Sequence, residues 1–423
     1  AGVPVQEFID ENAAFFQKLA GALSVHFDVF QKGSSKEHYA SSQKLWELCD
    51  KAGDIYRKEY EGLYCLGCEA FYAAEELDAN GECFEHPGKK LERVSEENYF
   101  FKLSKYKEQL INLLGSDKLR IVPAARKNEV LAFLKQPLQD ISISRSNERA
   151  KNWGVPVPRD DSQRMYVWFD ALNIYQSGVG FGLDEKTYKK WWPADVHIIG
   201  KGITRFHAVY WPAFLLSAGL PLPKSIFVHG YITVHGQKMS KTLGNVVDPF
   251  ELVQKYGPDA VRYFLLREIP SFEDGDFSYE KFAVRYNADL AAGLGNLVAR
   301  VLTLTTKISN FKFLISKQFS NIQFQKLTDE TKQKVEKNLE EFRFNDALVA
   351  IWDIIHFCDK YIDEKKPWVE SGEREGVVGD LLGALAVIGE LLKPFLPETS
   401  EKIAQRLRAK AGGGYPLFPR LDR

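Results

Sequence analysis

The chain has 423 residues, of which 45% are hydrophobic and 27% charged, and its formal net charge is −1 at pH 7. This length allows two or three domains, each with its own core, and the charge balance excludes a chain that is basic overall, so any RNA-binding surface must be a local patch. No apolar run reaches the roughly 18 residues that a membrane span needs, so no membrane partner is expected.

The first 56 residues predict helices. Apolar side chains recur at helical spacing in two groups, at Phe8, Phe15, Phe16 and Leu19 and then at Leu45, Trp46 and Leu48. Cys49 follows the second group and is expected to be a core residue.

A cluster of metal-binding residue types comes next. Cys65 and Cys68 form one pair with a two-residue gap, and Cys83 and His86 form a second pair after fourteen residues. Such pairs bring four ligands to a tetrahedron, and Zn²⁺ is the metal that these sulfur and nitrogen ligands favour. Four protein ligands leave no open position, so the zinc would be structural. Three buried thiols beside a surface histidine are the alternative interpretation.

The cysteine content also bears on the compartment. There are five cysteines, and an odd number with three of them clustered argues against a disulfide framework. A reducing compartment follows, and we expect a cytoplasmic location, with an organellar one left open.

Residues 140–217 predict the strands and helices of an α/β core. A strand is expected over residues 165–169, ending at Asp170, and a second over 195–199, which leads into Gly200 and a helix from Ile203 to about residue 217. Ile203, His207 and Trp211 are four residues apart and share a face of that helix.

An apolar stripe of this kind usually packs in a core. In an open α/β sheet, however, ligands bind beyond the carboxyl ends of the strands, where this helix begins. Trp168 and Tyr175, from the neighbouring strand–helix unit, are expected to face the same crevice. Aromatic walls with an aliphatic residue suit a polarizable thioether.

Two lysines lie in a tight loop between a strand and a helix. Residues 226–234 predict a buried strand. Asp248 predicts a helix start, because it is followed by Pro249 and, three positions after it, by Glu251. Lys238 and Lys241 lie between, where ammonium groups can stabilise charge that builds on a polyphosphate. The sequence is not a Walker loop, and a solvated lysine turn is the alternative.

From about residue 278 the pattern is helical. Apolar residues with 3–4 spacing predict helices over residues 287–306, 330–360 and 376–392, as in a helix bundle. Asn296 and Arg300 share a helix face, and Trp368 follows a proline in a turn. An amide, a guanidinium and an exposed ring can hydrogen-bond and stack unpaired bases, although an ordinary polar bundle surface explains the same spacing. The basic tail (Arg406, Arg408, Lys410, Arg420 and Arg423) is expected to be solvated.

Four motifs together resemble one enzyme family. Lys-Met-Ser-Lys-Thr at 238–242 is similar to the Lys-Met-Ser-Lys-Ser loop of class I aminoacyl-tRNA synthetases, with threonine in the last place. The segments at 165–171, 206–212 and 263–268 resemble methionyl-tRNA synthetases, and the similarity runs from about residue 1 to the C-terminus. On these motifs the chain is identified as a member of that family.

The resemblance implies the fold: an α/β, Rossmann-type class I catalytic domain with a zinc-knuckle insertion, then an all-α anticodon-binding bundle. The expected boundaries are 1–59 for the remainder of the first catalytic half, 60–110 for the zinc-binding insertion, 111–235 for the second catalytic half, 236–277 for the lysine loop and linker, and 278–423 for the bundle. Nothing matches the family's N-terminal His-Ile-Gly-His element, so we expect the chain to lack that part. Whether the chain alone is active stays open.

The resemblance also implies the activity, which is ATP-dependent activation of L-methionine followed by transfer to tRNA(Met). The amino-acid carboxylate attacks the α-phosphorus and pyrophosphate leaves, so catalysis rests on positioning and charge stabilisation. The implied partners are ATP with Mg²⁺, L-methionine and tRNA(Met), and a monomer is expected because no dimerisation domain is recognisable.

The family's site residues carry over as follows. The expected catalytic residues are Lys238 and Lys241, and ATP is expected to be bound by Lys238, Met239, Ser240, Lys241 and Gly200. The methionine-binding residues would be Trp168, Ala171, Leu172, Tyr175, Ile203, His207 and Trp211. The anticodon would be bound by Asn296, Arg300 and Trp368, and zinc by Cys65, Cys68, Cys83 and His86.

Two departures from the family pattern concern the catalytic core. Gly202 stands where the family usually has an aspartate that helps to hold the nucleotide, and Asn173 is displaced by one position. Two alternatives therefore stay open. One is another class I synthetase, for leucine, isoleucine, valine or cysteine, although no large editing insertion is recognisable, which argues against the first three. The other is a non-catalytic tRNA-binding protein.

Overall fold

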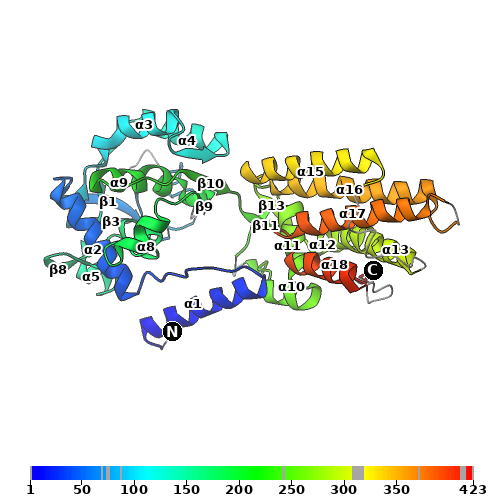
Figure 1. Ribbon diagram of the computed structural model, residues 1–423. Coiled ribbons are helices and arrows are strands. Elements are labelled where there is room, and N and C mark those ends of the chain that lie inside the picture. Colours follow the sequence, from blue (N-terminus) through cyan, green and yellow to red (C-terminus); the bar gives the residue numbers. More distant parts are fainter. Residues whose placement is uncertain are drawn as a thin grey trace. The chain divides into compact units, whose positions relative to one another are not determined.

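The computed structural model describes residues 2–67, 70–72, 77–85, 88–240, 243–306, 319–369, 372–409 and 416–421. The chain divides into two units, the first made of residues 1–13 and 27–229 and the second of residues 14–26 and 230–423. Each unit has its own hydrophobic core, and Figure 1 labels the helices and strands of both. None of the helices in the described residues has the length and apolar character needed to span a membrane.

The first unit mixes helices with short strands. Its helical segments, with α1 continuing into the second unit, are α1 (Val5–Ala22), α2 (Lys36–Lys51), η2 (Leu103–Tyr106), α3 (Lys107–Gly115), α4 (Ala124–Lys135), α5 (Asn147–Ala150), α6 (Val167–Ala171), α7 (Ile174–Ser177), α8 (Glu185–Trp191), η3 (Lys201–Ile203), η4 (Phe206–Tyr210) and α9 (Trp211–Ala218). Its strands are β1 (Ile55–Cys65), β2 (Ala70–Tyr72), β3 (Glu92–Phe101), β4 (Arg120–Val122), β5 (Ile141–Ser142), β6 (Ser144–Ser146), β7 (Pro156–Val157), β8 (Asp160–Met165), β9 (His197–Gly200) and β10 (Ser225–His229).

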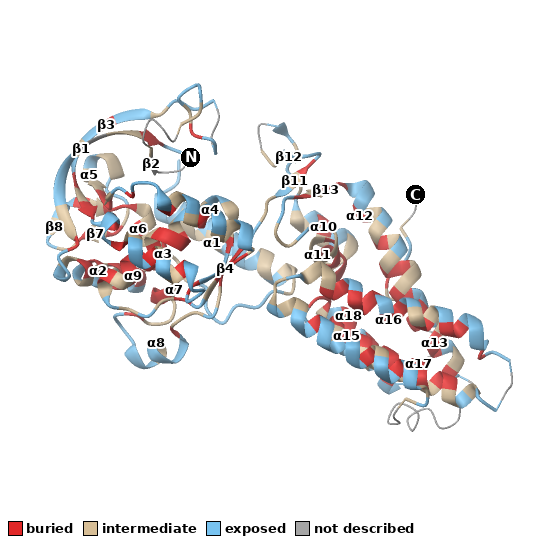
Figure 2. Cartoon of the chain, turned by 90° about the horizontal axis from the view of Figure 1, so that it is seen from above, coloured by how far each residue is buried: buried red, intermediate tan, exposed pale blue. Residues whose placement is uncertain are grey.

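A parallel sheet organises this unit. The strand order is β4-β10-β9, with Ile226 opposite both Ile121 and His197. Parallel strands need both faces covered, and the side chains of Ile226 and Val228 are fully buried in the core that α2, α3 and α9 also line. Figure 2 shows buried segments along α2 and α9. This parallel sheet confirms the predicted α/β architecture.

An antiparallel sheet includes strands from the segment that is predicted to bind zinc. Its order is β2-β1-β3-β5, and β1 pairs with β3 along almost its whole length. The cysteine cluster begins where β1 ends, at Cys65.

The second unit is mostly helical. Its helices are α10 (Pro249–Tyr256), α11 (Pro258–Arg267), α12 (Tyr279–Arg285), η6 (Tyr286–Gly295), α13 (Asn296–Thr305), α15 (Ile322–Glu340), α16 (Phe344–Lys365), α17 (Arg374–Leu392) and α18 (Pro397–Ala409). A small sheet of order β12-β11-β13 joins β11 (Ile232–Val234), β12 (Gln237–Lys238) and β13 (Gly275–Phe277).

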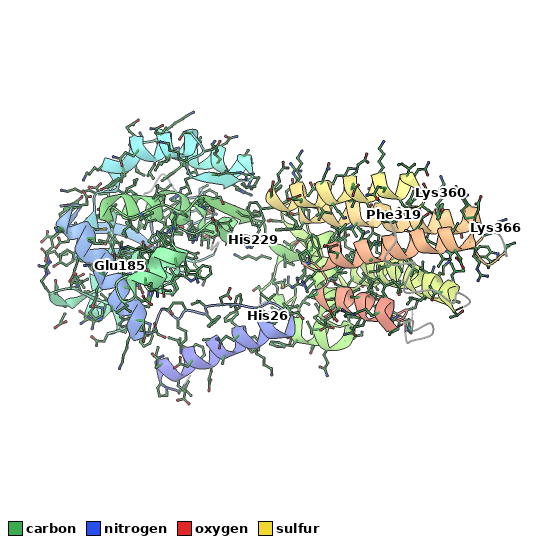
Figure 3. The ribbon with its side chains drawn as sticks, viewed as in Figure 1. His26, Glu185, His229, Phe319, Lys360 and Lys366 are labelled. Carbon is green, nitrogen blue, oxygen red and sulfur yellow. The ribbon has the colours of Figure 1, made fainter. Side chains whose placement is uncertain are left out.

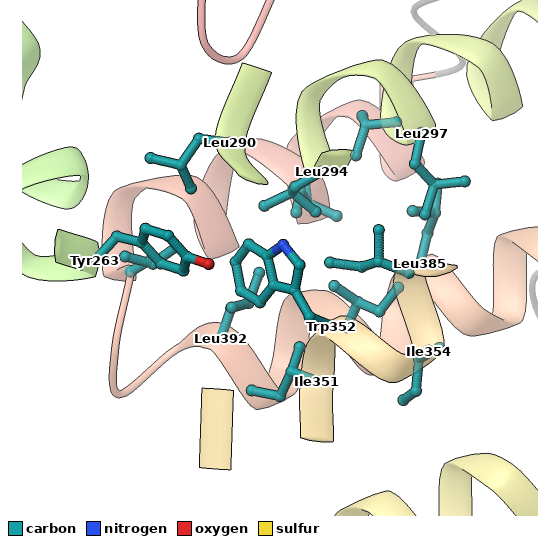
Figure 4. Close-up of a cluster of buried hydrophobic side chains, with 14 of the residues drawn as sticks. Tyr263, Leu290, Leu294, Leu297, Ile351, Trp352, Ile354, Leu385 and Leu392 are labelled. Carbon is teal, nitrogen blue, oxygen red and sulfur yellow. The ribbon is translucent and has the colours of Figure 1, made fainter. Parts of the chain in front are cut away.

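Aromatic packing holds the bundle of the second unit together. The ring of Trp352, on α16, lies 4.6 Å from that of Tyr263, on α11, and both side chains are buried (Figure 4). Leucines from η6, α13 and α17 surround the indole. The predicted helix bundle is therefore confirmed.

Three predicted elements have other boundaries. The strand expected over 165–169 is wrong, because β8 ends at Met165 and residues 167–171 form helix α6. Apolar and aromatic residues suit either structure. Contacts made by Asp170 to distant residues on α2 favour the helix.

The strand expected over 226–234 is two strands, β10 and β11, in different sheets. Gly230, between them, packs against the backbone of Glu273, where a Cβ atom would lie 2.1 Å from the carbonyl oxygen. A side chain does not fit there, so the chain breaks its pairing at this glycine.

The helix expected over 330–360 is also two helices, α15 and α16. Phe342 has a φ of 58°, which no helix interior accommodates, and the Arg343 amide donates to the carbonyl oxygen of Asn338 at 2.7 Å. The chain reverses here, and the two helices lie side by side (Figure 1).

Candidate functional site

A hydrogen-bonded pair joins two of the predicted pocket residues. The Tyr175 hydroxyl lies 2.8 Å from Nε2 of His207, and Nδ1 of His207 lies 2.9 Å from the Ile203 carbonyl oxygen. A carbonyl only accepts, so Nδ1 carries the proton and Nε2 accepts from the tyrosine. Burial lowers the pKa of His207 and raises the pKa of Tyr175 to about 12. Both side chains are therefore neutral at pH 7.

A stacked aromatic pair lies in the same region. The ring of Trp168 stacks on that of Phe206 at 3.8 Å, with 8° between the planes. Trp211 is fully buried, and the indole N–H groups of Trp168 and Trp211 have no hydrogen-bond partner among the described residues. Ala171 and Leu172 come from the same α6 segment as Trp168.

The position of these residues follows from the sheet. Gly200 ends β9 and lies opposite His229, the last residue of β10. η3, η4 and α9 follow, and η4 is a π-helical turn, a feature often found at functional sites. Ile203 and His207 are thus placed just beyond the carboxyl end of a parallel strand, where α/β proteins bind ligands.

The sequence analysis missed two neighbours of the predicted methionine-binding residues. Phe206 is adjacent in sequence to the predicted residue His207, but its stacking on Trp168 could be recognised only in the folded structure. His197 is buried, its ring lies 4.1 Å from that of Tyr175, and its Nε2 has no partner among the described residues. Burial, with a smaller effect of His207, lowers the pKa of His197 to about 3. In the sequence, the position of His197 at the start of a predicted strand gave no indication that it would contact Tyr175.

The lysine loop begins as a hairpin. Strands β11 and β12 pair through Thr233 and Lys238, and the turn residues His235 and Gly236 have φ values of 53° and 71°. The carboxylate of Asp276 accepts from the Gly236 amide at 2.7 Å and from the Thr233 hydroxyl at 3.0 Å. These contacts, the Gly236 one first, lower the pKa of Asp276, so an ionised carboxylate holds the turn.

Asn245 holds the other side of the loop. Its side-chain oxygen accepts from the Ser240 amide at 2.8 Å, and its Nδ2 donates to the Lys238 carbonyl at 3.3 Å. Met239 packs against the core of the second unit, and the ammonium group of Lys238 lies 5.1 Å from the centre of the Tyr231 ring. Lys241 and Thr242 lie outside the described residues. The predicted helix start at Asp248 is confirmed, because its side chain accepts from the Phe250 amide.

The three predicted base-reading residues lie in the second unit, two of them on helix α13 and one in a turn. Asn296 is exposed at the start of α13, and Trp368 is 52% exposed in the turn after α16. Arg300 is paired with two carboxylates of α16, Asp359 at 3.1 Å and Asp363 at 2.6 Å. Figure 3 shows Lys360 and Lys366 toward the same end of α16.

Two of the four predicted zinc ligands lie close together. Cys65 and Cys83 are both buried, and their sulfur atoms are 3.2 Å apart. Two thiolates on one tetrahedral zinc, at about 2.3 Å each, lie about 3.8 Å apart, so the observed separation is shorter than in such a site, although both sulfur atoms lie within reach of one ion. Cys68 and His86 lie outside the described residues, within which no group of three or more metal-ligand side chains occurs.

The other cysteines belong to the cores. Burial raises the pKa of the Cys49 thiol to about 12, and Cys358 is fully buried on α16. Such thiols are unreactive, and the expectation that Cys49 is a core residue is confirmed.

Comparison with known proteins gives a consistent result. Residues 1–302 match the family described as tRNA synthetases class I (M), and residues 323–417 match the anticodon-binding domain of tRNA ligases. The methionine–tRNA ligase of Caldanaerobacter subterraneus is 40% identical over 417 residues, which make up 96% of this chain and 64% of that protein. This chain therefore spans less than two thirds of that relative.

This chain covers a larger share of other relatives. The methionine–tRNA ligase of a Nostoc species is 42% identical over 96% of this chain and 78% of its own. The solved structure of Mycobacterium tuberculosis methionyl-tRNA synthetase in complex with methionyl-adenylate superposes with a TM-score of 0.88 at 35% identity, covering 99% of this chain and 88% of that one.

Proposed function

Because the chain belongs to the methionyl-tRNA synthetase family of class I tRNA synthetases, we propose that it activates L-methionine with ATP and transfers the methionyl group to tRNA(Met). The carboxylate of methionine attacks the α-phosphorus, and the bond to pyrophosphate breaks. The adenylate formed then passes its acyl group to the 3′-terminal hydroxyl of the tRNA. The protein supplies positioning and charge stabilisation.

The observation that carries this proposal is the hydrogen-bonded wall of Tyr175, His207 and Ile203 beyond strand β9. A neutral imidazole and aromatic rings suit an uncharged thioether, whose sulfur binds well at ring edges. Trp168, Ala171, Leu172 and Trp211 complete the proposed methionine site. One methylene is worth only about 1–3 kcal/mol in an apolar pocket, so the polar groups of the wall add discrimination against leucine.

The lysine loop is the proposed phosphate-binding element. Lys238 and Lys241 would bind the leaving phosphates as charge builds on them, with Met239 anchoring the loop in the core and Ser240 and Gly200 near the nucleotide. Asp276 and Asn245 hold the two sides of the loop, which supports a defined backbone from which Lys238 extends. Mg²⁺ accompanies the nucleotide and offsets part of the phosphate charge.

The second unit is the proposed tRNA-binding part. Asn296, Arg300 and Trp368 would read the anticodon, since an exposed ring can stack a base and a guanidinium can bond its edge. Asp359 and Asp363 hold Arg300 with its guanidinium oriented. Lys360, on the same helix, is exposed and lies 3.8 Å from the carboxylate of Glu364; it would exchange this surface ion pair for a tRNA phosphate.

A structural zinc is proposed for the insertion. Cys65, Cys68, Cys83 and His86 would hold it, and the short distance between two of the sulfur atoms supports this assignment. The metal would stabilise the fold of the insertion and take no part in the reaction.

Pyrophosphate exchange tests the proposed activity. A form of the chain extended by the family's N-terminal His-Ile-Gly-His element should exchange labelled pyrophosphate into ATP in a methionine-dependent manner, and the same assay shows whether the chain is active alone. Leucine-dependent or amino-acid-independent exchange would contradict methionine specificity. Filter binding with tRNA(Met) should be run in parallel, because binding without exchange by the extended form would favour a non-catalytic tRNA-binding protein.

A further inference from the structure

The segment that carries the proposed methionine wall rests on a polar face of α2. Trp168, Ala171, Leu172 and Tyr175 are interleaved along α6 and α7 with Asp170, Asn173 and Ser177, which hydrogen-bond to α2. Their partners there, His38, Ser41 and Ser42, are fully buried.

His38 binds both ends of this segment. Its Nε2 lies 2.6 Å from Oδ1 of Asp170, and its Nδ1 lies 2.7 Å from Oγ of Ser177. The carboxylate of Asp170 accepts from Nε2, and the Ser177 hydroxyl is the hydrogen-bond partner of Nδ1. The imidazole is therefore held at both nitrogen atoms.

Further bonds tie the middle of the segment to the same helix. The Ser42 hydroxyl donates to Asp170 at 3.0 Å, and Nδ2 of Asn173 donates to Ser41 at 2.9 Å. Gln176 donates to the Asn173 side-chain oxygen at 3.1 Å. The displaced asparagine of the sequence thus belongs to this network.

A buried polar network is an expensive way to join two helices. Well-packed apolar residues are often equally stable, and a partly satisfied network is worse than an apolar core. Directional hydrogen bonds, unlike apolar contacts, fix a single orientation of the α6–α7 segment on α2. Here that orientation decides the direction in which Trp168 and Tyr175 point.

We propose that His38 and Asp170 are positioning residues that hold the α6–α7 wall in the orientation that binds the amino acid. This inference rests on the proposed function. Neither residue is assigned a contact with substrate: Asp170 orients the segment that contains Trp168, and His38 orients Asp170 and Ser177.

The test compares His38→Ala with a matched change on the same helix. Ser35 caps α2, where its hydroxyl accepts from the His38 amide at 3.1 Å, so Ser35→Ala weakens α2 without removing the ring. Methionine binding to the full chain is titrated calorimetrically. His38→Ala should raise the Kd for methionine about 10- to 100-fold, because a small misplacement of a binding wall has effects of that size. Ser35→Ala should leave the Kd within about twofold of the wild type at a similar loss of stability.

Further measurements distinguish a positioning role of His38 from a general effect on folding. His38→Gln keeps a donor that can reach Asp170, and it should recover part of the affinity that His38→Ala loses. The Kd for ATP should be unchanged in all three variants. Amide hydrogen exchange over residues 166–178 should accelerate in His38→Ala and remain slow in Ser35→Ala.

The proposal is overturned if His38→Ala and Ser35→Ala weaken methionine binding equally, or if His38→Ala leaves both binding and exchange over 166–178 unchanged. Failure of the wild-type chain to bind methionine would count against the proposed function instead. Hydrogen exchange would then still decide whether His38 holds the segment.

Discussion

The proposed amino-acid wall and the lysine loop are built in opposite ways. The wall around Tyr175 and His207 is buried and internally hydrogen-bonded, and its ionisable groups are held neutral. In the loop, Lys238 is exposed on a two-residue strand, and the contacts that hold the loop come from Asp276 and Asn245 at its edges.

This difference matches two chemical tasks. Selecting an uncharged side chain requires a shape that is set before the ligand arrives, so burial and neutral polar groups serve it well. Stabilising a charge that develops during a reaction requires cations near a site that the nucleotide must enter and leave. Substitutions in the wall should therefore act on methionine binding, and substitutions in the loop should act on ATP and turnover.

The largest expected effect is in the loop. Lys241→Ala should lower kcat for methionine-dependent pyrophosphate exchange by about 100- to 1000-fold, because it removes a charge that acts mainly in the transition state. The Kd for methionine should stay within about twofold. Lys334→Ala, an exposed lysine on α15, is the control. A loss of methionine affinity equal to the loss of kcat would remove the contrast between the two regions.

A smaller effect is expected in the wall. Tyr175→Phe removes the donor to Nε2 of His207 and leaves a buried acceptor unsatisfied, at a cost of about 1–3 kcal/mol. The KM for methionine should rise about tenfold, with the KM for ATP unchanged. Tyr188→Phe removes a hydroxyl that donates to Gln176 at 2.6 Å and is the matched control. An unchanged methionine KM in Tyr175→Phe would contradict a role for this pair in binding.

The buried wall should also make stability depend on pH. His197 has a folded-state pKa of about 3, below its ordinary 6.5, so the unfolded chain binds the extra proton between these values. Above pH 6.5 the His197 imidazole is neutral in both states and does not change the free energy of unfolding. As the pH falls below 6.5, the free energy of unfolding decreases by about 1.4 kcal/mol per pH unit. Urea unfolding at pH 7.5 and 5.5 should show a loss in the wild type that exceeds that of His197→Gln by about 1.4 kcal/mol. Equal losses would mean that this imidazole protonates while folded.

The smallest effect concerns the edge of the loop. Asn245→Ala removes two hydrogen bonds to the loop backbone, each worth about 1 kcal/mol. The KM for ATP should rise a few-fold while the KM for methionine stays constant. Asn245→Asp keeps the acceptor for the Ser240 amide, so its KM for ATP should lie between those of the wild type and Asn245→Ala. An Asn245→Ala variant as active as the wild type would show that the loop needs no support from this side chain.

Local patterns in the sequence predicted several features correctly. The spacing of Ile203 and His207 placed them one helical turn apart, where the ring bonds to the Ile203 carbonyl. Asp248 with Pro249 predicted the start of α10. Each of these depends on residues a few positions apart, whose geometry a helix or a cap determines by itself.

The features that were missed depend on distant partners. Residues 165–169 suit a strand locally, and Asp170 bonds to His38, 132 positions away, in the helix that forms instead. The break at Gly230 depends on the backbone of Glu273. Phe206 and His197 join the wall through ring contacts with Trp168 and Tyr175, which no spacing along the chain predicts.

By itself, the sequence determined the types of chemistry present: a paired lysine loop, an aromatic and imidazole stripe, a cysteine cluster and a helical C-terminal part. Hydrophobic period, caps and turn residues encode these features locally. The tertiary structure alone decided the direction of the side chains in the wall and their neutral charge state. Orientation and burial depend on atoms contributed by distant segments, and the core assembles only when the whole unit folds.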